Sequence, residues 1–313
     1  NSGREKYDGT QKSVTGYTWT ATNKLYSEED FIFTGSAEVT GTDAGTYEME
    51  LSSSDFANTS DNFADVSFVI EDGTLVIEKR TVVLTSGDGH KEYDGSALTN
   101  DEVTVGGDGF AEGEGATYSV TGSQLDAGSS DNTFDYFLNE GTKADNYEIT
   151  AAYGTLTVEP VSETVIVTIK ENSGREKYDG TQKSVTGYTW TATNELYSED
   201  DFVFTGSAEV TGTDAGTYEM ELTSSDFANI SDNFADVSFV IEDGSLVIEK
   251  RTVVLTSGDG SKEYDGSTLT NDEVTVGGDG FAEGEGATFE VTSSPLDAGS
   301  SANTFDYVLN EGT

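Results

Sequence analysis

The chain lacks cysteine, has two prolines and one histidine, and carries 15 lysines and arginines against 60 aspartates and glutamates. Without cysteine it forms no disulfide bond and offers no thiol nucleophile. A formal net charge of −45 argues against nucleic acid or an anionic membrane surface as a partner, because both are bound through clustered Lys and Arg. No apolar run approaches the roughly 20 residues that cross a bilayer.

What the chain has in abundance is repetition. Residues 1–142 and 172–313 are offset by 171 and differ at 14 of 142 positions. Each copy is itself double, because the Tyr-Asp-Gly at residues 7–9 recurs at residues 93–95. We therefore divide the chain into four repeats, A1 (residues 1–79), B1 (80–160), A2 (161–250) and B2 (251–313). Duplication of a large module favours reach or multivalency over catalysis.

The two ends of the chain are out of phase with these repeats. A2 opens with a strand-like segment, residues 161–170, whose counterpart would precede Asn1, and B2 stops at Thr313, the counterpart of Thr142. We therefore expect A1 to lack its first strand and B2 its last one or two. The resulting open sheet edges would favour pairing with strands of other molecules. The polar start at Asn1 indicates an internal fragment of a longer protein.

Short apolar or alternating runs predict β-strands throughout, for example at residues 31–33, 47–51 and 66–70. No stretch has apolar residues at helical spacing, so we expect only single helical turns, at residues 27–30 and 53–55. Aromatic residues make up 11% of the chain, which argues against disorder. The sequence predicts an all-β protein of tandem small β-sandwiches, Ig-like or β-grasp-like, in an elongated rod.

The candidates for catalysis are weak. His90 is the only histidine, lies in an expected exposed turn, and is replaced by Ser261 in the second copy. Carboxylates are numerous, but no pair stands out as the two that a glycosidase needs at a defined separation. We therefore expect no enzymatic activity and no cofactor, calcium being the one ion to consider.

Two acidic loops that contain glycine are candidates for calcium, because Ca²⁺ prefers carboxylate and carbonyl oxygens. Their ligands would be Asp108, Glu112 and Glu114 in B1 and Asp279, Glu283 and Glu285 in B2. A further acidic cluster comprises Asp55, Asp61 and Asn62. No EF-hand or nonapeptide calcium pattern is present, so a solvated acidic loop is the alternative.

Aromatic residues alternate in one predicted strand of each A repeat. Tyr17 and Trp19 share a face in A1, as do Tyr188 and Trp190 in A2. An exposed face of this kind would be a platform on which a glycan stacks, and packing into the core is the alternative. The tyrosine of each Tyr-Asp-Gly is expected to pack into the core beneath its turn.

The few cations mark the joints between repeats. Lys79-Arg80 and Lys250-Arg251 lie between A and B, and we expect them to meet carboxylates of the neighbouring repeat and fix the angle between the two. Pro160 limits the freedom of the joint from B1 to A2. A Lys–Asn isopeptide bond is a less favoured means of stiffening. The pairs would be Lys6 with Asn62 and Lys177 with Asn233.

Three motifs recur in order through the repeats and give the chain a family likeness. In A1 they are Lys6-Tyr7-Asp8-Gly9, Asp43-Ala44-Gly45-Thr46-Tyr47 and Gly73-Thr74-Leu75-Val76-Ile77. With them the chain resembles the MBG/YDG-type tandem repeats of Gram-positive bacterial cell-surface adhesins. B1 and B2 depart from the pattern, because Ser-Ser replaces the Thr-Tyr step. The resemblance implies an extracellular location at the cell surface, a cell-wall anchor outside this fragment, and adhesion.

Together these observations predict a non-enzymatic stalk or spacer of a surface adhesin, with weak multivalent adhesion to a host glycan or extracellular protein. The alternatives are a lectin-like module that binds glycan through its aromatic platforms and a repeat made rigid by calcium. We expect a monomeric rod without membrane insertion, whose ends are open to strand pairing.

Overall fold

Strands dominate the computed structural model, which describes residues 1–313. The other regular elements are 3-10 helices of three residues each, namely η1 (Glu28–Asp30), η2 (Ser53–Asp55), η3 (Ala144–Asn146), η4 (Glu199–Asp201) and η5 (Ser224–Asp226). The amide and hydroxyl of Ser27 both donate to the Asp30 carboxylate and cap η1. The all-β prediction is confirmed, and single helical turns lie at both predicted places.

The chain divides into two compact units, Asn1–Val161 and Ser162–Thr313. The division lies beside the predicted boundary between B1 and A2. Each unit therefore holds one A repeat followed by one B repeat.

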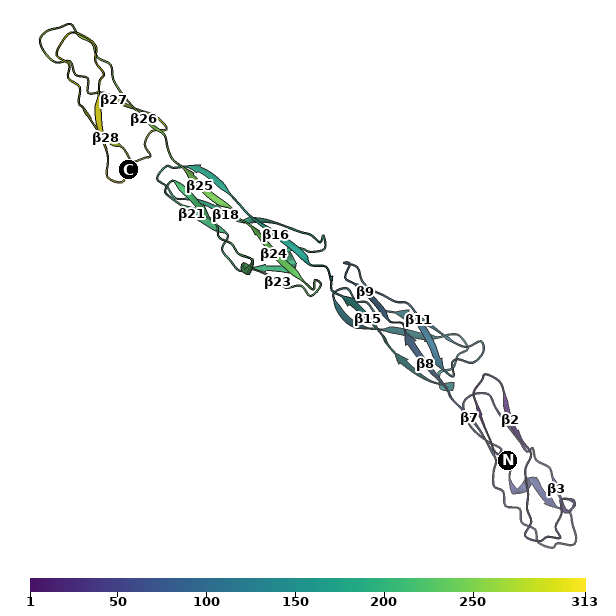
Figure 1. The fold of residues 1–313 in the computed structure, drawn as a ribbon. Helices are drawn as coiled ribbons and strands as arrows, with labels where there is room; N and C mark the ends of the chain where they lie inside the picture. The colour runs from purple at the N-terminus through teal and green to yellow at the C-terminus, as the bar shows by residue number, and fades with distance from the viewer. The chain divides into compact units, whose positions relative to one another are not determined.

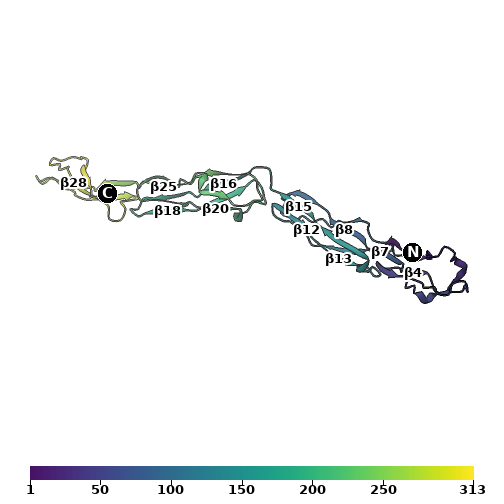
Figure 2. The same cartoon turned by 90° about the horizontal axis from the view of Figure 1, so that it is seen from below.

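B1 shows the complete topology of a B repeat. Its strands are β8 (Arg80–Ser86), β9 (Gly89–Glu92), β10 (Val103–Gly107), β11 (Ala116–Val120), β12 (Gly128–Asn132), β13 (Phe134–Leu138), β14 (Tyr147–Ala152) and β15 (Gly154–Glu159). One sheet has the order β10-β8-β14 and another the order β12-β15-β9, in which β12 lies beside β15 (Figure 2). The first strand, β8, pairs parallel with β14, and β9 pairs parallel with the last strand, β15. The first and last strands of the repeat are thus each central in a sheet.

A2 repeats this plan. Its strands are β16 (Val165–Glu171), β17 (Gly174–Lys177), β18 (Lys183–Thr186), β19 (Tyr188–Ala192), β20 (Phe202–Phe204), β21 (Glu209–Gly212), β22 (Gly216–Glu219), β23 (Phe227–Asn229), β24 (Val237–Glu242) and β25 (Ser245–Glu249). The sheets are ordered β19-β16-β24 and β17-β25-β22. The first strand, β16, pairs parallel with β24, which lies beside it (Figure 1), and β17 pairs parallel with the last strand, β25. These parallel pairs distinguish the small β-sandwich from an immunoglobulin sandwich of purely antiparallel sheets.

A1 and B2 each lack a central strand. A1 contains β1 (Gly3–Lys6), β2 (Lys12–Thr15), β3 (Phe31–Phe33), β4 (Glu38–Gly41), β5 (Gly45–Glu48), β6 (Phe56–Asn58) and β7 (Thr74–Glu78), and no counterpart of β16. B2 contains β26 (Val253–Ser257), β27 (Val274–Gly278), β28 (Ala287–Val291) and β29 (Phe305–Leu309), and no counterpart of β14 or β15. In the complete repeats B1 and A2, the strands at these positions, β15 and β16, each lie in the middle of a sheet.

The central strands carry the core. Leu75, Leu84 and Leu156 have no exposed surface, and they lie on β7, β8 and β15. Burial of one such side chain contributes roughly 1.5–3 kcal/mol to folding. One cluster of packed residues runs from Leu75 of A1 through Val82 of B1. One hydrophobic cluster is thus continuous across the boundary between A1 and B1.

Candidate functional site at the joint between A and B

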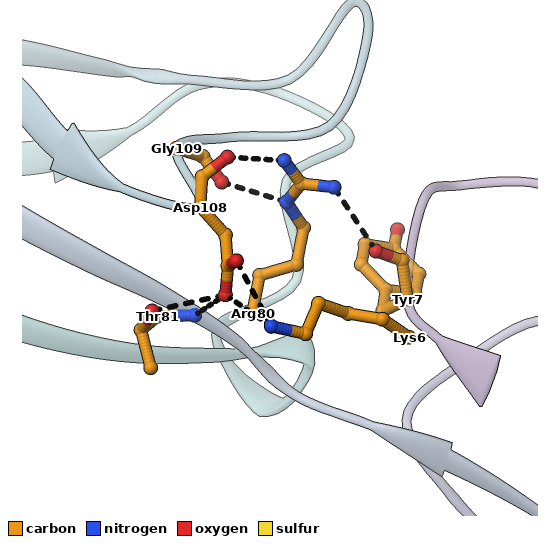
Figure 3. Close-up of polar contacts among 6 residues, drawn as sticks. All are labelled: Lys6, Tyr7, Arg80, Thr81, Asp108 and Gly109. Carbon is orange, nitrogen blue, oxygen red and sulfur yellow. Dashed lines mark hydrogen bonds and ion pairs between the residues drawn. The ribbon is translucent and has the colours of Figure 1, made fainter. Parts of the chain in front are cut away.

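A single residue, Lys79, separates β7 of A1 from β8 of B1. Arg80, the next residue, donates to three backbone carbonyls (Figure 3). Its Nε lies 2.8 Å from Gly109 O, its Nη1 lies 3.3 Å from Tyr7 O, and its Nη2 bonds Asp108 O. The predicted carboxylate partner is wrong for Arg80, because the planar guanidinium fits carbonyls converging from both repeats.

Lys6 supplies the ion pair of the joint instead (Figure 3). Its Nζ lies 2.9 and 2.8 Å from the two carboxylate oxygens of Asp108. The amide and hydroxyl of Thr81 donate to the same carboxylate, each at 2.9 Å. The Lys6 ammonium, and after it the Thr81 amide, hold the pKa of Asp108 well below its usual range. Both side chains of this pair are partly exposed, so the pair contributes little to the free energy of unfolding. Its main effect is to fix the position of A1 relative to B1.

Two tyrosines share one carboxylate beneath this ion pair. The hydroxyls of Tyr7 from A1 and Tyr147 from B1 donate to the two oxygens of Glu114, Tyr147 at 2.7 Å. The rings meet edge to face with centroids 5.7 Å apart. Burial, and after it the Glu114 carboxylate, raises the pKa of Tyr7 to about 12. Tyr7 of the first Tyr-Asp-Gly motif is buried, as predicted, but against the next repeat. The prediction is wrong for the motif of B2, whose Tyr264 is 69% exposed.

A buried asparagine completes the joint. Asn146 of η3 has no exposed surface; its Oδ1 accepts from the Ala44 amide at 2.7 Å, and its Nδ2 donates to Asp43 at 3.0 Å. Lys143 pairs with the other oxygen of Asp43 at 2.6 Å. The Asp-Ala-Gly turn of A1 is thereby fastened to B1. Nothing in the local sequence marks Asn146 for this role, because its partners lie about a hundred positions earlier.

The second unit contains the first half of the same joint. Lys177 pairs with Asp279 at 2.6 Å, and Tyr178 donates to Glu285. Arg251 again donates to three carbonyls, those of Tyr178, Asp279 and Gly280. Tyr178 is less buried than Tyr7, which is 4% exposed.

The family model of the MBG domain matches residues 1–79 and 165–250, which are A1 and nearly all of A2. These matches cover more than half of the chain. The chain belongs to the MBG domain family. The B repeats lie outside the matched residues and join the MBG domains through the contacts above.

Two other comparisons add little to this identification. A search of curated proteins found no match. Among solved structures, the Sidekick-1 immunoglobulin domains 1–5 are similar at 10% identity and a TM-score of 0.20, covering 94% of this chain and 66% of that one. The N-terminal eight Ig domains of Down Syndrome Cell Adhesion Molecule (DSCAM) isoform 1.30.30 have 10% identity and a TM-score of 0.17, covering 100% and 49%. The chain thus spans about two thirds of the first and half of the second. No helix of this MBG chain is long and apolar enough to cross a membrane.

The structure gives the calcium candidates other partners. Asp108 bonds Lys6 and Thr81, and Glu114 bonds the two tyrosines, while Glu112 is exposed. The corresponding carboxylates of B2, Asp279 and Glu285, bond Lys177 and Tyr178. No group of three or more His, Cys, Asp or Glu side chains is placed to hold a metal ion. The carboxylates of these two acidic loops are therefore not arranged as a set of calcium ligands.

Calcium is expected to leave the melting temperature of the chain unchanged. Asp108 and Glu114 already accept hydrogen bonds from fixed partners, and a cation would have to displace them. The measurement is thermal unfolding with millimolar calcium beside magnesium at the same concentration, which controls for screening of the net charge. A rise of several degrees that is specific to calcium would contradict this expectation and support the predicted site.

The aromatic platform of each MBG domain packs against other aromatics. Tyr17 meets Phe33 and Phe56 with centroids 4.9 and 5.2 Å apart, and Trp19 meets Phe31 at 5.2 Å. Trp19 nevertheless keeps 38% of its surface exposed. In A2 the equivalent residues Tyr188 and Trp190 make the same contacts, with Phe204 and Phe227, and with Phe202.

The remaining candidates from the sequence are His90 and the lysines suggested for isopeptide bonds, and none of them lies in a site with the partners that its proposed role needs. His90 is exposed, as expected, but lies on strand β9 in place of a turn. The amine of Lys6 lies on Asp108, whereas Asn62 occupies an exposed turn. Lys177 likewise contacts Asp279. The lysines suggested for isopeptide bonds therefore bridge successive repeats.

Acid is expected to release the Lys6–Asp108 pair. Folding lowers the pKa of Asp108, so the pair contributes stability that is present above the unfolded pKa of about 4 and is lost as pH falls further. Urea unfolding of the native chain and of Asp108→Asn should differ at pH 7 and converge below about pH 4. Relief of carboxylate repulsion acts on both proteins, so their difference isolates the pair. A difference as large at pH 2 as at pH 7 would contradict this role.

Proposed function

We propose that this chain is a non-enzymatic spacer in an extracellular surface protein, and that its building block is a rigid pair of one MBG domain and one B repeat. The observation that carries the proposal is the joint. A one-residue linker, a hydrophobic cluster continuous across the boundary and a set of polar bonds at Arg80, Lys6, Glu114 and Asn146 hold the two repeats together. A hinge would need few contacts and a longer linker.

The internal duplication supports the same function. None of the 14 differences between the two copies changes a residue of the joint, since Lys, Tyr, Arg, Thr, Asp and Glu recur at the same places in the second. By contrast, the sole histidine is lost in one copy. A spacer needs repeated mechanical contacts and gains nothing from a repeated reactive group. The high negative charge adds repulsion that opposes collapse of the chain on itself.

Small-angle scattering of the whole chain tests this proposal. A globular protein of 313 residues would have a radius of gyration of roughly 20 Å. We expect the radius of gyration of this chain to lie well above that value. Each A–B pair should also resist proteolysis between Lys79 and Arg80. A compact scattering profile, or rapid tryptic cleavage at that linker in the native chain, would contradict the spacer function.

Weak adhesion to glycan is a second candidate, favoured by the exposed part of Trp19. A glycan array with the native chain and with Trp19→Ala tests it. Binding that disappears in the variant supports a lectin-like role, and a blank array leaves the spacer function alone.

A further inference from the structure

In A2 and in B1, two parallel ladders of backbone bonds hold the first segment of the repeat against the last. In A2, β16 pairs with β24 over six residue pairs that begin at Val165 and Val237. After a short crossover, β17 pairs with β25 over four residue pairs that end at Lys177 and Glu249. B1 has the same six and four pairs, between β8 and β14 and between β9 and β15. Two repeats of different sequence thus share one arrangement.

These ladders lie across the path of any pull along the chain. The chain enters A2 at Val165 and leaves it after Glu249, and the parallel register places these residues at opposite ends of the ladders, roughly 40 Å apart. A pull on both ends of the domain therefore slides β16 and β17 against β24 and β25 along the strand direction. All the pairs resist together, because sliding displaces each of them at once. An antiparallel pair that is pulled from one end opens one residue pair at a time.

A buried polar side chain joins the two sliding segments at the crossover. Glu171, the last residue of β16, is 2% exposed, and its two oxygens accept from the amides of Leu222 at 2.7 Å and Gly244 at 2.6 Å. Gly244 lies between β24 and β25. In B1, Ser86 ends β8 and is 3% exposed, and its hydroxyl accepts from the amide of Gly154, the first residue of β15, at 3.0 Å. In both repeats a side chain of the first segment thus holds an amide of the last.

The two crossovers also touch through their backbones. A Cβ atom at Gly244 would lie 2.4 Å from the Asn172 carbonyl oxygen, so no other residue fits there without a shift. The side chains of Val167, Ile169 and Leu246, which flank this contact in the ladders, have no exposed surface. Hydrogen bonds shielded from water in this way are stronger than exposed ones.

We propose that the MBG domain and its B repeat are load-bearing modules that resist tension applied along the chain, with Glu171 as the residue that locks the two sliding segments of A2. The proposal rests on the spacer function and deepens it, because a spacer passes any pull on one end of the chain to the other. The parallel ladders supply the resistance, and the Glu171 carboxylate adds charge-assisted bonds at the point where the two ladders meet.

Optical tweezers at constant load test the proposal on the full chain. The chain has no cysteine, so pairs of cysteines at exposed positions define where the load acts. Glu163→Cys with Lys250→Cys loads A2 from end to end. Gln182→Cys with Thr213→Cys loads the antiparallel β18–β21 pair from one end. We expect A2 to withstand a severalfold higher load in the first geometry and to release roughly 250 Å in a single step.

Glu171→Gln in the same two geometries tests the role of the carboxylate. Loss of the charged acceptor should shorten the lifetime of folded A2 at a fixed end-to-end load about tenfold. The load that opens the β18–β21 pair should stay unchanged, because Glu171 does not lie in its path. Asp226→Asn is the matched control. Asp226 also accepts a backbone amide at 2.7 Å, but that amide belongs to Thr223 in the same turn, so this variant should keep the native lifetime.

Equal unfolding loads in the two geometries would overturn the proposal, because the ladders would then give no directional resistance. Equal end-to-end lifetimes of the native domain and Glu171→Gln would overturn the role of the carboxylate. A chain that is elongated in scattering but yields at low load refutes the load-bearing role and leaves the spacer function standing. A compact scattering profile refutes the spacer function itself, so the two failures are distinguishable.

Discussion

Arg80→Ala is expected to lower the free energy of unfolding of the unit Asn1–Val161 by about 2–4 kcal/mol. The substitution removes one guanidinium that bonds carbonyls of A1 and B1 together, and it leaves the Tyr7, Asp108 and Gly109 carbonyls without that partner. Hydrogen bonds to a charged group contribute about 1.5–3 kcal/mol, and the three bonds share one donor, so their loss is not additive. Urea unfolding measures the change.

Arg4→Ala is the matched control for this variant. Arg4 pairs with Glu78 at the surface, where its side chain is 68% exposed, and both residues belong to A1. Exposed ion pairs contribute about 0–1 kcal/mol, so this variant should unfold close to the native chain. Equal effects of Arg4→Ala and Arg80→Ala would mean that Arg80 acts through general electrostatics, against the role assigned to it at the joint.

Ile169→Ala is expected to destabilise A2 by about 2–5 kcal/mol, whereas Ile166→Ala should cost less than about 1.5 kcal/mol. Both residues lie on β16, but Ile169 has no exposed surface and Ile166 is 42% exposed. The pair thus compares one residue type on the two faces of one central strand. Truncation of the inward side chain loses its transfer free energy and leaves a cavity, while the outward one stays partly solvated.

Thermal or urea unfolding monitored by Trp190 fluorescence measures both variants in a Trp19→Phe background, because Trp190 pairs with Ile169 across the sheet and is then the only tryptophan. The control for fluorescence changes in the native state is the Trp190 emission of each variant before unfolding. Similar losses for the two isoleucines would contradict a two-layered A2 whose core lies on one face of β16.

Most strand segments were predictable from the sequence, but their pairing was not. Residues 74–77 were predicted as a strand and lie in β7, and the Ser-x-x-Asp pattern predicted the turn at Ser27–Asp30. Of the predicted strand at residues 47–51 only the first two residues lie in β5, and the predicted strand at residues 66–70 does not form in A1. Parallel pairing joins a strand at the start of a repeat to one near its end, about seventy positions away, and no local pattern encodes such a partner. The central position of β16 in A2 and of β15 in B1 likewise emerged only from the sheet order.

The position of the joint between A and B was predicted from the sequence, but the bonds that its residues make were not. Lys79-Arg80 stood out because cations are rare, and Arg80 does hold the joint, although through carbonyls. Asp108 and Glu114 stood out because they are acidic. A carboxylate can bind calcium, and it can equally accept a hydrogen bond from a lysine or a tyrosine. Two of their actual partners, Lys6 and Tyr7, come from the preceding repeat, about a hundred residues away, so tertiary packing decides between these roles.

The central claim is that A1 and B1 form one rigid body, and a distance distribution between the two repeats tests it most directly. The chain has no cysteine, so Glu48→Cys in A1 and Ser119→Cys in B1, both at exposed positions, accept spin labels at these two sites alone. Pulsed electron–electron double resonance should give one narrow distance in the native joint and a broader one after Arg80→Ala. A broad distribution in the chain with its joint intact would contradict the claim.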